Sequence, residues 1–331
     1  MENQEFDFLA VGDIVTDAFI RLQDAELHCG INNEQCEICM AFGAKIPYES
    51  VTVVPAVGNS PNAAVAAARL GLKTALVTDL GQDAHGAEAI ATLKKEGVSS
   101  DFVRAHEGQA TNYHYVLWFK DDRTILIKHE KYNYLWPEVS AKWLYLSSLG
   151  EHSLPYHQEI LKFLTAHPET KLAFQPGTFQ MKLGREQLAG FYARSEVVLC
   201  NVGEAEKILG VTGVEPKELL KQMHALGPRI VVITDGPNGA YAYDGTNSYF
   251  MPPYPDPKPP LERTGAGDAF SSTFVAALAL GKTIPEALTW GPINSMSVVQ
   301  AVGAQAGLLK RGALEQLLAT APSDYKARPI A

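Results

Sequence analysis

Short apolar runs that end at a glycine or a polar turn recur along the chain, and stretches with helical spacing of apolar residues lie between them. Apolar runs of this length are typical of strands buried on both faces of a sheet. The runs that predict strands are 6–12, 74–81, 143–149, 172–174, 197–200 and 230–234. The stretches that predict helices are 62–70, 86–96, 156–167, 204–209, 216–226 and 269–280. This alternation predicts an α/β fold with a central, mostly parallel sheet covered on both faces, and ligands that bind at the carboxyl ends of its strands.

Two segments, about 14–57 and 110–130, depart from this alternation. Their β-branched and aromatic residues predict paired antiparallel strands, and the period of two places Tyr113, Tyr115 and Leu117 on one face. Together they predict a small sheet that projects from the main domain as a lid and keeps water from a reactive group. An edge extension or a dimer interface is the alternative. Because no internal repeat or low-complexity linker occurs, the whole chain of 331 residues is expected to form one domain with this lid.

The composition indicates an ordinary globular protein. Apolar residues make up 46% of the chain, which is enough for a sizeable core. The net charge of −9 argues against a broad nucleic-acid-binding surface and leaves room for a local positive pocket. No apolar run reaches membrane-spanning length, and the first residues lack the pattern of a signal peptide, so no membrane association and a cytoplasmic location are expected.

The four cysteines are too few and too unevenly spaced to predict a disulfide framework. Cys200 ends an apolar run and is expected in the core. Cys29, Cys36 and Cys39 are expected to be ordinary reduced thiols, and a zinc site that also uses His28 is the alternative. A single Cys-x-x-Cys pair gives that alternative little support, because structural zinc sites use four ligands.

The segment from Arg263 to Phe270 joins a Gly-Ala-Gly turn to one acid at the start of a run of small and apolar residues. A glycine turn that opens a helix directs backbone N–H groups and the positive end of the helix dipole toward an anion. Asp268 would lie beside that anion, where a carboxylate can accept a proton from a hydroxyl group that attacks phosphorus. The pattern predicts a phosphate-transfer site, and a purely structural turn with an acid at the helix start is the alternative.

Polar residues elsewhere fit the same chemistry. Asp17 lies past the first predicted strand and could accept two hydroxyl hydrogen bonds or be a solvated loop acid, and Asp13 is the weaker of these two acids. Asn62, at the head of a predicted helix, could bind a hydroxyl group or cap the helix. Glu204, three positions after Asn201, could orient magnesium-bound water or only compensate the helix dipole.

Six short motifs follow one another over nearly the whole chain. They are Gly12-Asp-Ile-Val-Thr-Asp17, Gly58-Asn-Ser-Pro-Asn62, Leu80-Gly81-Gln-Asp83, Asn201-Val-Gly-Glu204, Thr234-Asp-Gly236-Pro-Asn-Gly239 and Thr264-Gly-Ala-Gly-Asp268. Their order resembles the ribokinase-like (PfkB) carbohydrate kinase family. The resemblance implies a three-layer sandwich with a small β-sheet lid, and an ATP-dependent kinase that phosphorylates a hydroxyl group of a sugar or a sugar-like molecule.

The resemblance also implies a role for each matching residue. Asp268 would be the general base, and the backbone N–H groups of Gly265, Ala266 and Gly267 would stabilise the phosphoryl oxygens. The acceptor would contact Asp13, Asp17, Gly58 and Asn62. The nucleotide would contact Asn201, Glu204, Thr234, Gly236, Gly239 and, by position alone, Asn294, for which helix packing is the alternative. Glu204 would orient Mg²⁺ through water, and a monovalent cation such as K⁺ would bind backbone near Glu262 and Thr264.

Three positions depart from the family pattern. Val57 replaces the first of two glycines before Asn62, and Glu262 stands where an aspartate is usual. Gln175-Pro176-Gly177 occupies the place where many members carry Asp-Pro-Asn, which leaves the choice of acceptor open.

Several alternatives remain beside a sugar kinase. The aromatic second lid segment keeps a nucleoside acceptor open, and it also fits a homodimer through the lid. A catalytically silent homologue that binds a sugar or a nucleotide is a further alternative. A dehydrogenase is disfavoured, because no Gly-x-Gly-x-x-Gly turn follows the first predicted strand.

Overall fold

The computed structural model describes residues 5–29, 36–120 and 122–330. Its largest unit is an 11-stranded sheet. In spatial order its strands are β17 (Arg328–Ile330), β16 (Ser248–Met251), β15 (Ala240–Tyr243), β14 (Ile230–Thr234), β13 (Ser195–Asn201), β12 (Lys171–Phe174), β11 (Ala141–Leu146), β1 (Phe6–Val11), β6 (Thr74–Gly81) and β7 (Val98–Ser99), with β8 (Val103–His106) also paired to β6. All pairs from β7 to β14 are parallel, which confirms the predicted central sheet. The antiparallel extension through β15, β16 and β17 was not predicted from the sequence.

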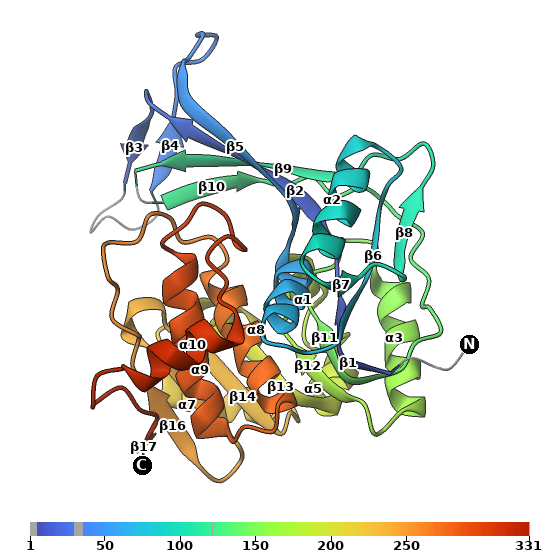
Figure 1. Ribbon diagram of the computed structural model, residues 1–331, viewed down its shortest axis with the longest axis vertical. Helices are drawn as coiled ribbons and strands as arrows, with labels where there is room; N and C mark the ends of the chain where they lie inside the picture. The colour runs from blue at the N-terminus through green and yellow to red at the C-terminus, as the bar shows by residue number, and fades with distance from the viewer. Residues whose placement is uncertain (1–4, 30–35, 121, 331) are drawn as a thin grey trace.

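Helices cover both faces of this sheet (Figure 1). On one face lie α1 (Asn59–Arg69), α2 (Ala84–Lys95), α8 (Ala266–Ala279), α9 (Ile284–Val298) and α10 (Arg311–Ala319). On the other lie α3 (Leu154–Ala166), α5 (Ala189–Arg194), α6 (Val202–Leu209) and α7 (Pro216–His224), and α4 (Thr178–Leu183) contacts α6. Helices cover both faces because the strands carry apolar side chains on both. In β1, for example, Phe8 and Ala10 are buried in one core, and Leu9 and Val11 are buried in the other. The three-layer α/β sandwich is therefore confirmed.

The two segments that depart from the alternation form a separate four-stranded sheet, which we call the small sheet. Its strands, in spatial order, are β10 (Asp122–Leu126), β9 (Asn112–Phe119), β2 (Val15–Leu22) and β5 (Tyr48–Val57). The pairs β10/β9 and β2/β5 are antiparallel, as predicted, and β2 and β9 join the two segments in parallel. In Figure 1 the small sheet stands over one end of the main body, and the hairpin of β3 (Glu26–His28) and β4 (Glu37–Cys39) lies beyond it.

The prediction of reduced thiols is wrong for two cysteines. Cys29 and Cys36 form a disulfide, and their Cα atoms are 4.0 Å apart. The reason is the β3/β4 pairing, since His28 lies opposite Glu37 and the two cysteines follow and precede that pair. Cys39 and the buried Cys200 are free thiols, and the described residues contain no group of three or more potential ligands for a zinc site.

No helix within the described ranges is both long and apolar enough to cross a membrane.

Candidate active site

The glycine turn at the start of α8 places Asp268 on the wall of a cavity. Gly265 precedes α8 with a φ of 79°, a left-handed conformation that glycine adopts without strain. A Cβ atom on Gly265 would lie 2.6 Å from the Cα of Ala304, so a larger residue would push the two segments apart. Asp268 lies on the first helical turn, where the backbone N–H groups lack partners within the helix. The sequence prediction of this turn, with its acid at the helix start, is confirmed.

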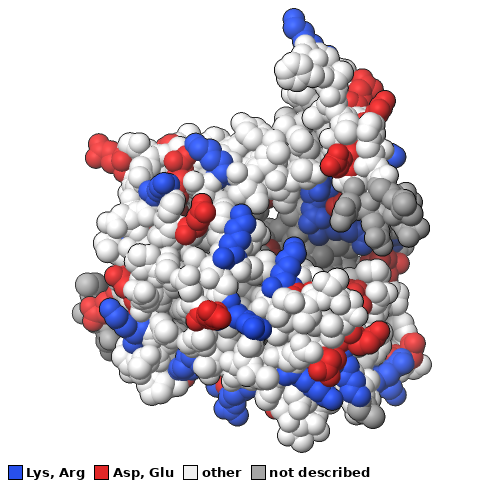
Figure 2. Space-filling view, turned by 180° about the vertical axis from the view of Figure 1, so that it is seen from behind, with Lys and Arg blue, Asp and Glu red and all other residues white. Residues whose placement is uncertain are grey.

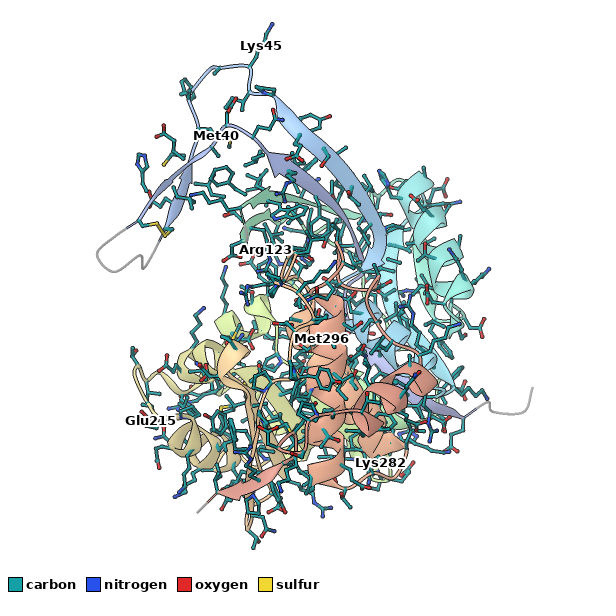
Figure 3. All side chains as sticks on the ribbon, turned by 60° about the vertical axis from the view of Figure 1, so that its left-hand side comes forward. Met40, Lys45, Arg123, Glu215, Lys282 and Met296 are labelled. Carbon is teal, nitrogen blue, oxygen red and sulfur yellow. A yellow bond between two sulfur atoms is a disulfide. The ribbon has the colours of Figure 1, made fainter. Side chains whose placement is uncertain are left out.

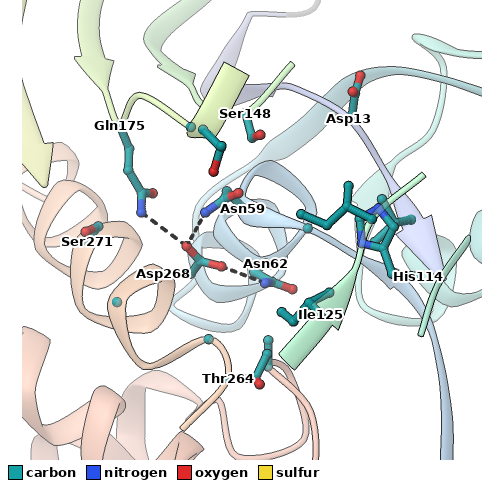
Figure 4. A pocket seen from close by; sticks show the side chains of 18 of the residues that line it. Asp13, Asn59, Asn62, His114, Ile125, Ser148, Gln175, Thr264, Asp268 and Ser271 are labelled. Carbon is teal, nitrogen blue, oxygen red and sulfur yellow. Dashed lines mark hydrogen bonds between the residues drawn. The ribbon is translucent and has the colours of Figure 1, made fainter. Parts of the chain in front are cut away.

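The cavity in front of Asp268 has a volume of about 330 Å³. Residues that end or follow the parallel strands line one side, among them Ser148, Gln175 and Asn201. The small sheet lines the opposite side, where His114 and Ile125 lie next to each other (Figure 4). Figure 2 shows the corresponding hollow beneath the small sheet, with Lys and Arg side chains around it. The cavity therefore lies at the carboxyl ends of the strands, where ligands bind in parallel sheets.

Three side-chain amides converge on the carboxylate of Asp268 (Figure 4). Asn59 Nδ2 donates to Oδ1 at 2.7 Å, and Asn62 Nδ2 donates to Oδ2 at 2.9 Å. Gln175 Nε2 also donates to Oδ1, at 3.1 Å, while its Oε1 accepts from the hydroxyl group of Tyr145. Gln175, which stands where many family members carry an aspartate, thus supplies one of the amide donors that hold Asp268.

Opposing effects set the proton affinity of Asp268. Burial raises the pKa of this carboxyl group above its usual value, and the negative charge of Asp17 adds to the rise. The hydrogen bonds from Asn62, Asn59 and Gln175 lower the pKa, because they stabilise the ionised form. The net direction is upward, so this carboxyl group has a higher proton affinity than that of an exposed aspartate.

The two acids after β1 differ in their surroundings. Asp13 accepts a hydrogen bond from the hydroxyl group of Tyr134 at 2.8 Å and pairs with Nδ1 of His129 at 2.8 Å, so each oxygen has a protein partner. Asp17 is buried within β2 instead of lying in a solvated loop. Its Oδ1 lies 3.5 Å from Nδ1 of His114 and has no hydrogen-bond partner. Asp17 is therefore the acid with hydrogen-bonding capacity left for a ligand.

Asn62 and Gly58 both line the cavity at the start of α1. The helix begins at Asn59, so Asn62 does not cap it. Gln305 Nε2 donates to Asn62 Oδ1 at 3.0 Å, which turns the Asn62 amide nitrogen toward Asp268. Gly58 has a φ of 121°, and a Cβ atom there would lie 2.7 Å from the backbone oxygen of Asp13.

A second cavity of about 260 Å³ adjoins the first, and Thr234, Arg263 and Gly267 line both. Two other residues of the predicted nucleotide turn, Gly236 and Gly239, also line the second cavity. Its remaining walls are mostly apolar, with Phe270, Met296 and Val299 among them. An apolar slot that meets a polar cavity at a helix N-terminus has room for a flat ring with a phosphate chain directed toward α8.

Asn201 and Glu204 line the first cavity and also cap α6 reciprocally. Glu204 N donates to Asn201 Oδ1, and Asn201 N donates to Glu204 Oε2, both at 2.9 Å. Burial raises the pKa of Glu204 above its usual value, the backbone hydrogen bond from Asn201 opposes the rise, and the charge of Asp268 adds to it. Asn201 and Glu204 therefore cap α6 and line the cavity at the same time. The carboxylate oxygens of Glu204 and the amide oxygen of Asn201 are oxygen ligands of the kind that Mg²⁺ prefers.

Asn294 lies outside both cavities. It is fully buried in α9, where its Nδ2 donates to Thr273 Oγ1 at 2.7 Å and its Oδ1 accepts from Leu309 N at 2.8 Å. Its neighbours Pro292, Ser295 and Met296 line the second cavity in its place. The nucleotide role given to Asn294 does not fit this placement, whereas the alternative of helix packing does.

Sequence reasoning missed several side chains of the site. Asn59 and Gln175 hold Asp268, His129 pairs with Asp13, and Arg263 lines both cavities. For Asn59 the available signal was its position between Gly58 and Asn62 in the amino-terminal motif. For Gln175 the signal was its departure from the family pattern, and for Arg263 it was the position directly before the glycine turn. For His129, no local pattern in the sequence pointed to the cavity.

Comparisons with known proteins agree with this geometry. The model of the pfkB family carbohydrate kinases matches residues 38–311. Ribokinase of Bacillus subtilis is 26% identical over 268 residues, which cover 79% of this chain and 87% of that protein. The 5-dehydro-2-deoxygluconokinase of Bacillus velezensis is 26% identical over 346 residues, which cover 96% of each chain. The solved structure of Arabidopsis thaliana ribokinase complexed with ribose and ATP has the same fold, with a TM-score of 0.76, 20% identity, and coverage of 95% of this chain and 99% of that one.

Proposed function

The chain belongs to the pfkB family of carbohydrate kinases, and we propose that it transfers the γ-phosphoryl group of ATP to a hydroxyl group of a sugar or a sugar-like acceptor. The observation that carries the proposal is the position of the 265–268 turn between two adjoining cavities. Asp268 faces the polar cavity, and Gly267 lines both. An acceptor in one cavity and a nucleotide in the other would meet at this turn.

Asp268 is the proposed general base. It accepts the proton of the acceptor hydroxyl group as that oxygen attacks the γ-phosphorus, and ADP leaves on the opposite side. The backbone N–H groups of Gly265, Ala266 and Gly267 stabilise the charge on the transferred phosphoryl oxygens. The amides that hold Asp268 favour its ionised form and orient the carboxylate for this step.

The acceptor is proposed to bind under the small sheet. Asp17 and Asn62 offer hydrogen bonds to its hydroxyl groups, Gly58 leaves space beside them, and Asp13 positions His129 at the cavity wall. The small sheet then acts as a lid, since residues from β2, β9 and β10 cover this cavity. Covering the acceptor would exclude the water that competes with it for the phosphoryl group.

The nucleotide is proposed to bind in the second cavity, at the turn of Thr234, Gly236 and Gly239. The carboxylate of Glu204 and the amide oxygen of Asn201 suit the hydration shell of Mg²⁺, which supplies charge neutralisation on the phosphates when bound. The sequence contains no Gly-x-x-x-x-Gly-Lys-Ser/Thr segment, so a P-loop lysine is not part of this proposal.

A monovalent cation near the turn is a further part of the proposal. Glu262 is buried, and its carboxylate accepts hydrogen bonds from Thr264 N at 2.7 Å and Gly303 N at 3.2 Å. The hydroxyl oxygen of Thr264 is buried without a hydrogen-bond partner. A buried carboxylate beside an unpaired oxygen fits a cation such as K⁺, and omission of K⁺ from the assay would test it.

A homodimer through the small sheet also stays a prediction, as does the cytoplasmic location. Val51, Val53, Tyr115 and Leu126 of the small sheet are between 45% and 51% exposed, which supports a contact between two copies. Sedimentation of the purified protein would test it, and a monomer at micromolar concentration would contradict it.

The first test compares the wild type with Asp268→Asn in a panel of Mg-ATP with pentoses, hexoses, their acids and phosphates, and nucleosides. We expect the variant to lose about 10²- to 10⁴-fold in kcat, with nucleotide binding retained. Asp244→Asn is the matched control, since Asp244 lies in an exposed turn and lines neither cavity. Phosphorylated nucleosides would favour the nucleoside kinase, and ligand binding without turnover in the wild type would favour the silent homologue.

A further inference from the structure

Three polar side-chain atoms that the small sheet contributes to the walls of the acceptor cavity are buried without a hydrogen-bond partner. They are Oδ1 of Asp17, Nε2 of His114 and Nε of Arg123, and all three residues line the cavity. A buried polar atom without a partner costs about 1–3 kcal/mol, so folded proteins seldom keep three in one place without a use. Their side chains belong to one surface of the small sheet, which indicates a ligand that completes their hydrogen bonds.

The pairing of strands fixes how these side chains are spread. Asp17 lies opposite His114 on the neighbouring strand, and Val116 lies opposite Ile125. His114 lies two residues before Val116, and Arg123 lies two residues before Ile125. Because β9 and β10 are antiparallel, these two steps run in opposite directions. His114 and Arg123 therefore lie at opposite ends of the shared surface. Four residue steps separate their levels, which is roughly 13 Å between backbone positions. The length of the arginine side chain covers part of that span.

Arg123 lies on the side of the small sheet that faces the main body, as Figure 3 shows. Its Nη1 donates to Asp122 Oδ1 at 3.1 Å, but the Asp122 side chain is 74% exposed, and such a pair is weak in water. The Nε atom of Arg123 is buried and has no hydrogen-bond partner. The guanidinium group therefore offers a cation and an unused donor to the cavity.

We propose that Arg123 binds an anionic group of the acceptor, a carboxylate, and that the substrate is a sugar acid. This inference rests on the proposed function and adds the substrate class. The guanidinium group matches a carboxylate in charge and shape. Asp17 and His114 receive the hydroxyl or carbonyl groups at the other end of the same acceptor, beside Asp268.

The charges in the cavity favour a carboxylate over a phosphate monoester as the anionic group. The carboxylates of Asp13, Asp17, Glu204 and Asp268 line the same cavity, and Arg123 is the arginine that the small sheet contributes to it. Arg263 lines both cavities, next to the proposed site of the nucleotide phosphates. One guanidinium group of the small sheet among four carboxylates balances a single negative charge better than two.

The test compares Arg123→Gln with the wild type on three acceptors with the same six-carbon chain: a sugar acid, the corresponding neutral alcohol and a hexose phosphate. We expect the wild type to prefer the acid, and the variant to lose about tenfold to a hundredfold in kcat/KM for the acid through KM. Activity with the neutral alcohol should stay within twofold, and Arg123→Lys should restore part of the loss for the acid. Arg311→Gln, which breaks an exposed pair with Glu315 on α10, is the matched control.

Four results would overturn the inference. They are equal losses with the acid and the neutral alcohol, a raised KM for ATP in place of the acceptor, a preference of the wild type for the neutral alcohol, and a preference for the hexose phosphate. Calorimetric binding of the acid without ATP separates this inference from the proposed function. If the wild type phosphorylates nothing, the proposed function fails. Tighter binding of the acid by the wild type than by Arg123→Gln would still support the carboxylate site in that case. Equal binding by the two proteins, or no binding, would refute the carboxylate site.

Discussion

Removal of one amide donor from Asp268 should change the pH dependence of the reaction more than its maximum rate. Asn59→Ala is the clearest case, because Asn59 Nδ2 makes the shortest of the three amide hydrogen bonds to the carboxylate, at 2.7 Å. Burial already raises the pKa of Asp268, and this hydrogen bond opposes the rise. Without the donor, the pKa should rise further, so a smaller fraction of the base is ionised at acidic pH.

The magnitude follows from the strength of a hydrogen bond to a charged group. Such a bond contributes about 1.5–3 kcal/mol, and about 1.4 kcal/mol corresponds to one pKa unit. Water can enter the cavity and replace part of the lost bond, so we expect a shift near the lower limit, about one unit. Below the pKa, kcat/KM should fall about tenfold relative to the wild type, whereas the plateau at high pH should change little.

The assay is kcat/KM for the acceptor between pH 4.5 and 9, with ADP measured directly after quenching so that no coupling enzyme limits the acidic range. Asn247→Ala is the matched control, since Asn247 carries an exposed turn amide and lines neither cavity. An acidic limb that moves to lower pH, or that stays in place at an unchanged rate, would refute the assignment of Asp268 as the base. An acidic limb that stays in place while the rate falls equally at every pH would show instead that Asn59 acts by positioning alone.

Three further changes test other parts of the site. Gly265→Ala forces a side chain into the left-handed region and against Ala304, so we expect the protein to lose about 1–3 kcal/mol of stability and several degrees in Tm, and an unchanged melting curve would contradict the close approach. Glu204→Gln removes the carboxylate proposed to hold Mg²⁺ through water, so the Mg²⁺ concentration for half-maximal rate should rise about tenfold at a fixed ATP concentration. An unchanged Mg²⁺ titration would show that Glu204 does not have that role. Met296→Trp fills the second cavity, so KM for ATP should rise about tenfold while KM for the acceptor stays constant. A raised KM for the acceptor with an unchanged KM for ATP would place the nucleotide elsewhere.

Local patterns were sufficient for the main elements. The apolar runs at 74–81 and 230–234 coincide with β6 and β14, because a strand buried on both faces needs a continuous apolar stretch. The glycine turn before α8 was predicted for the same kind of reason, since its backbone conformation and its free N–H groups depend on neighbouring residues alone. The order of the six motifs extended these local signals to a family.

The partners of Asp268 could not be predicted in this way. Asn59 lies 209 residues before it and Gln175 lies 93 residues before it, so their contact depends on the order of strands in the sheet and on the packing of α1 against α8. The same limit explains Asn294, because its position in the sequence near the nucleotide cavity says nothing about which side of α9 its amide faces.

The sequence by itself therefore determined most of the main elements, the glycine turn before α8 and the acid that follows it, which are properties of short stretches of chain. Only the tertiary structure decided which groups surround that acid, that Asp17 keeps an unpaired oxygen whereas Asp13 does not, and that Arg123 lies over the acceptor cavity. The physical reason is that hydrogen bonding, burial and charge act between atoms a few ångströms apart in space, and the fold brings those atoms together from distant parts of the chain.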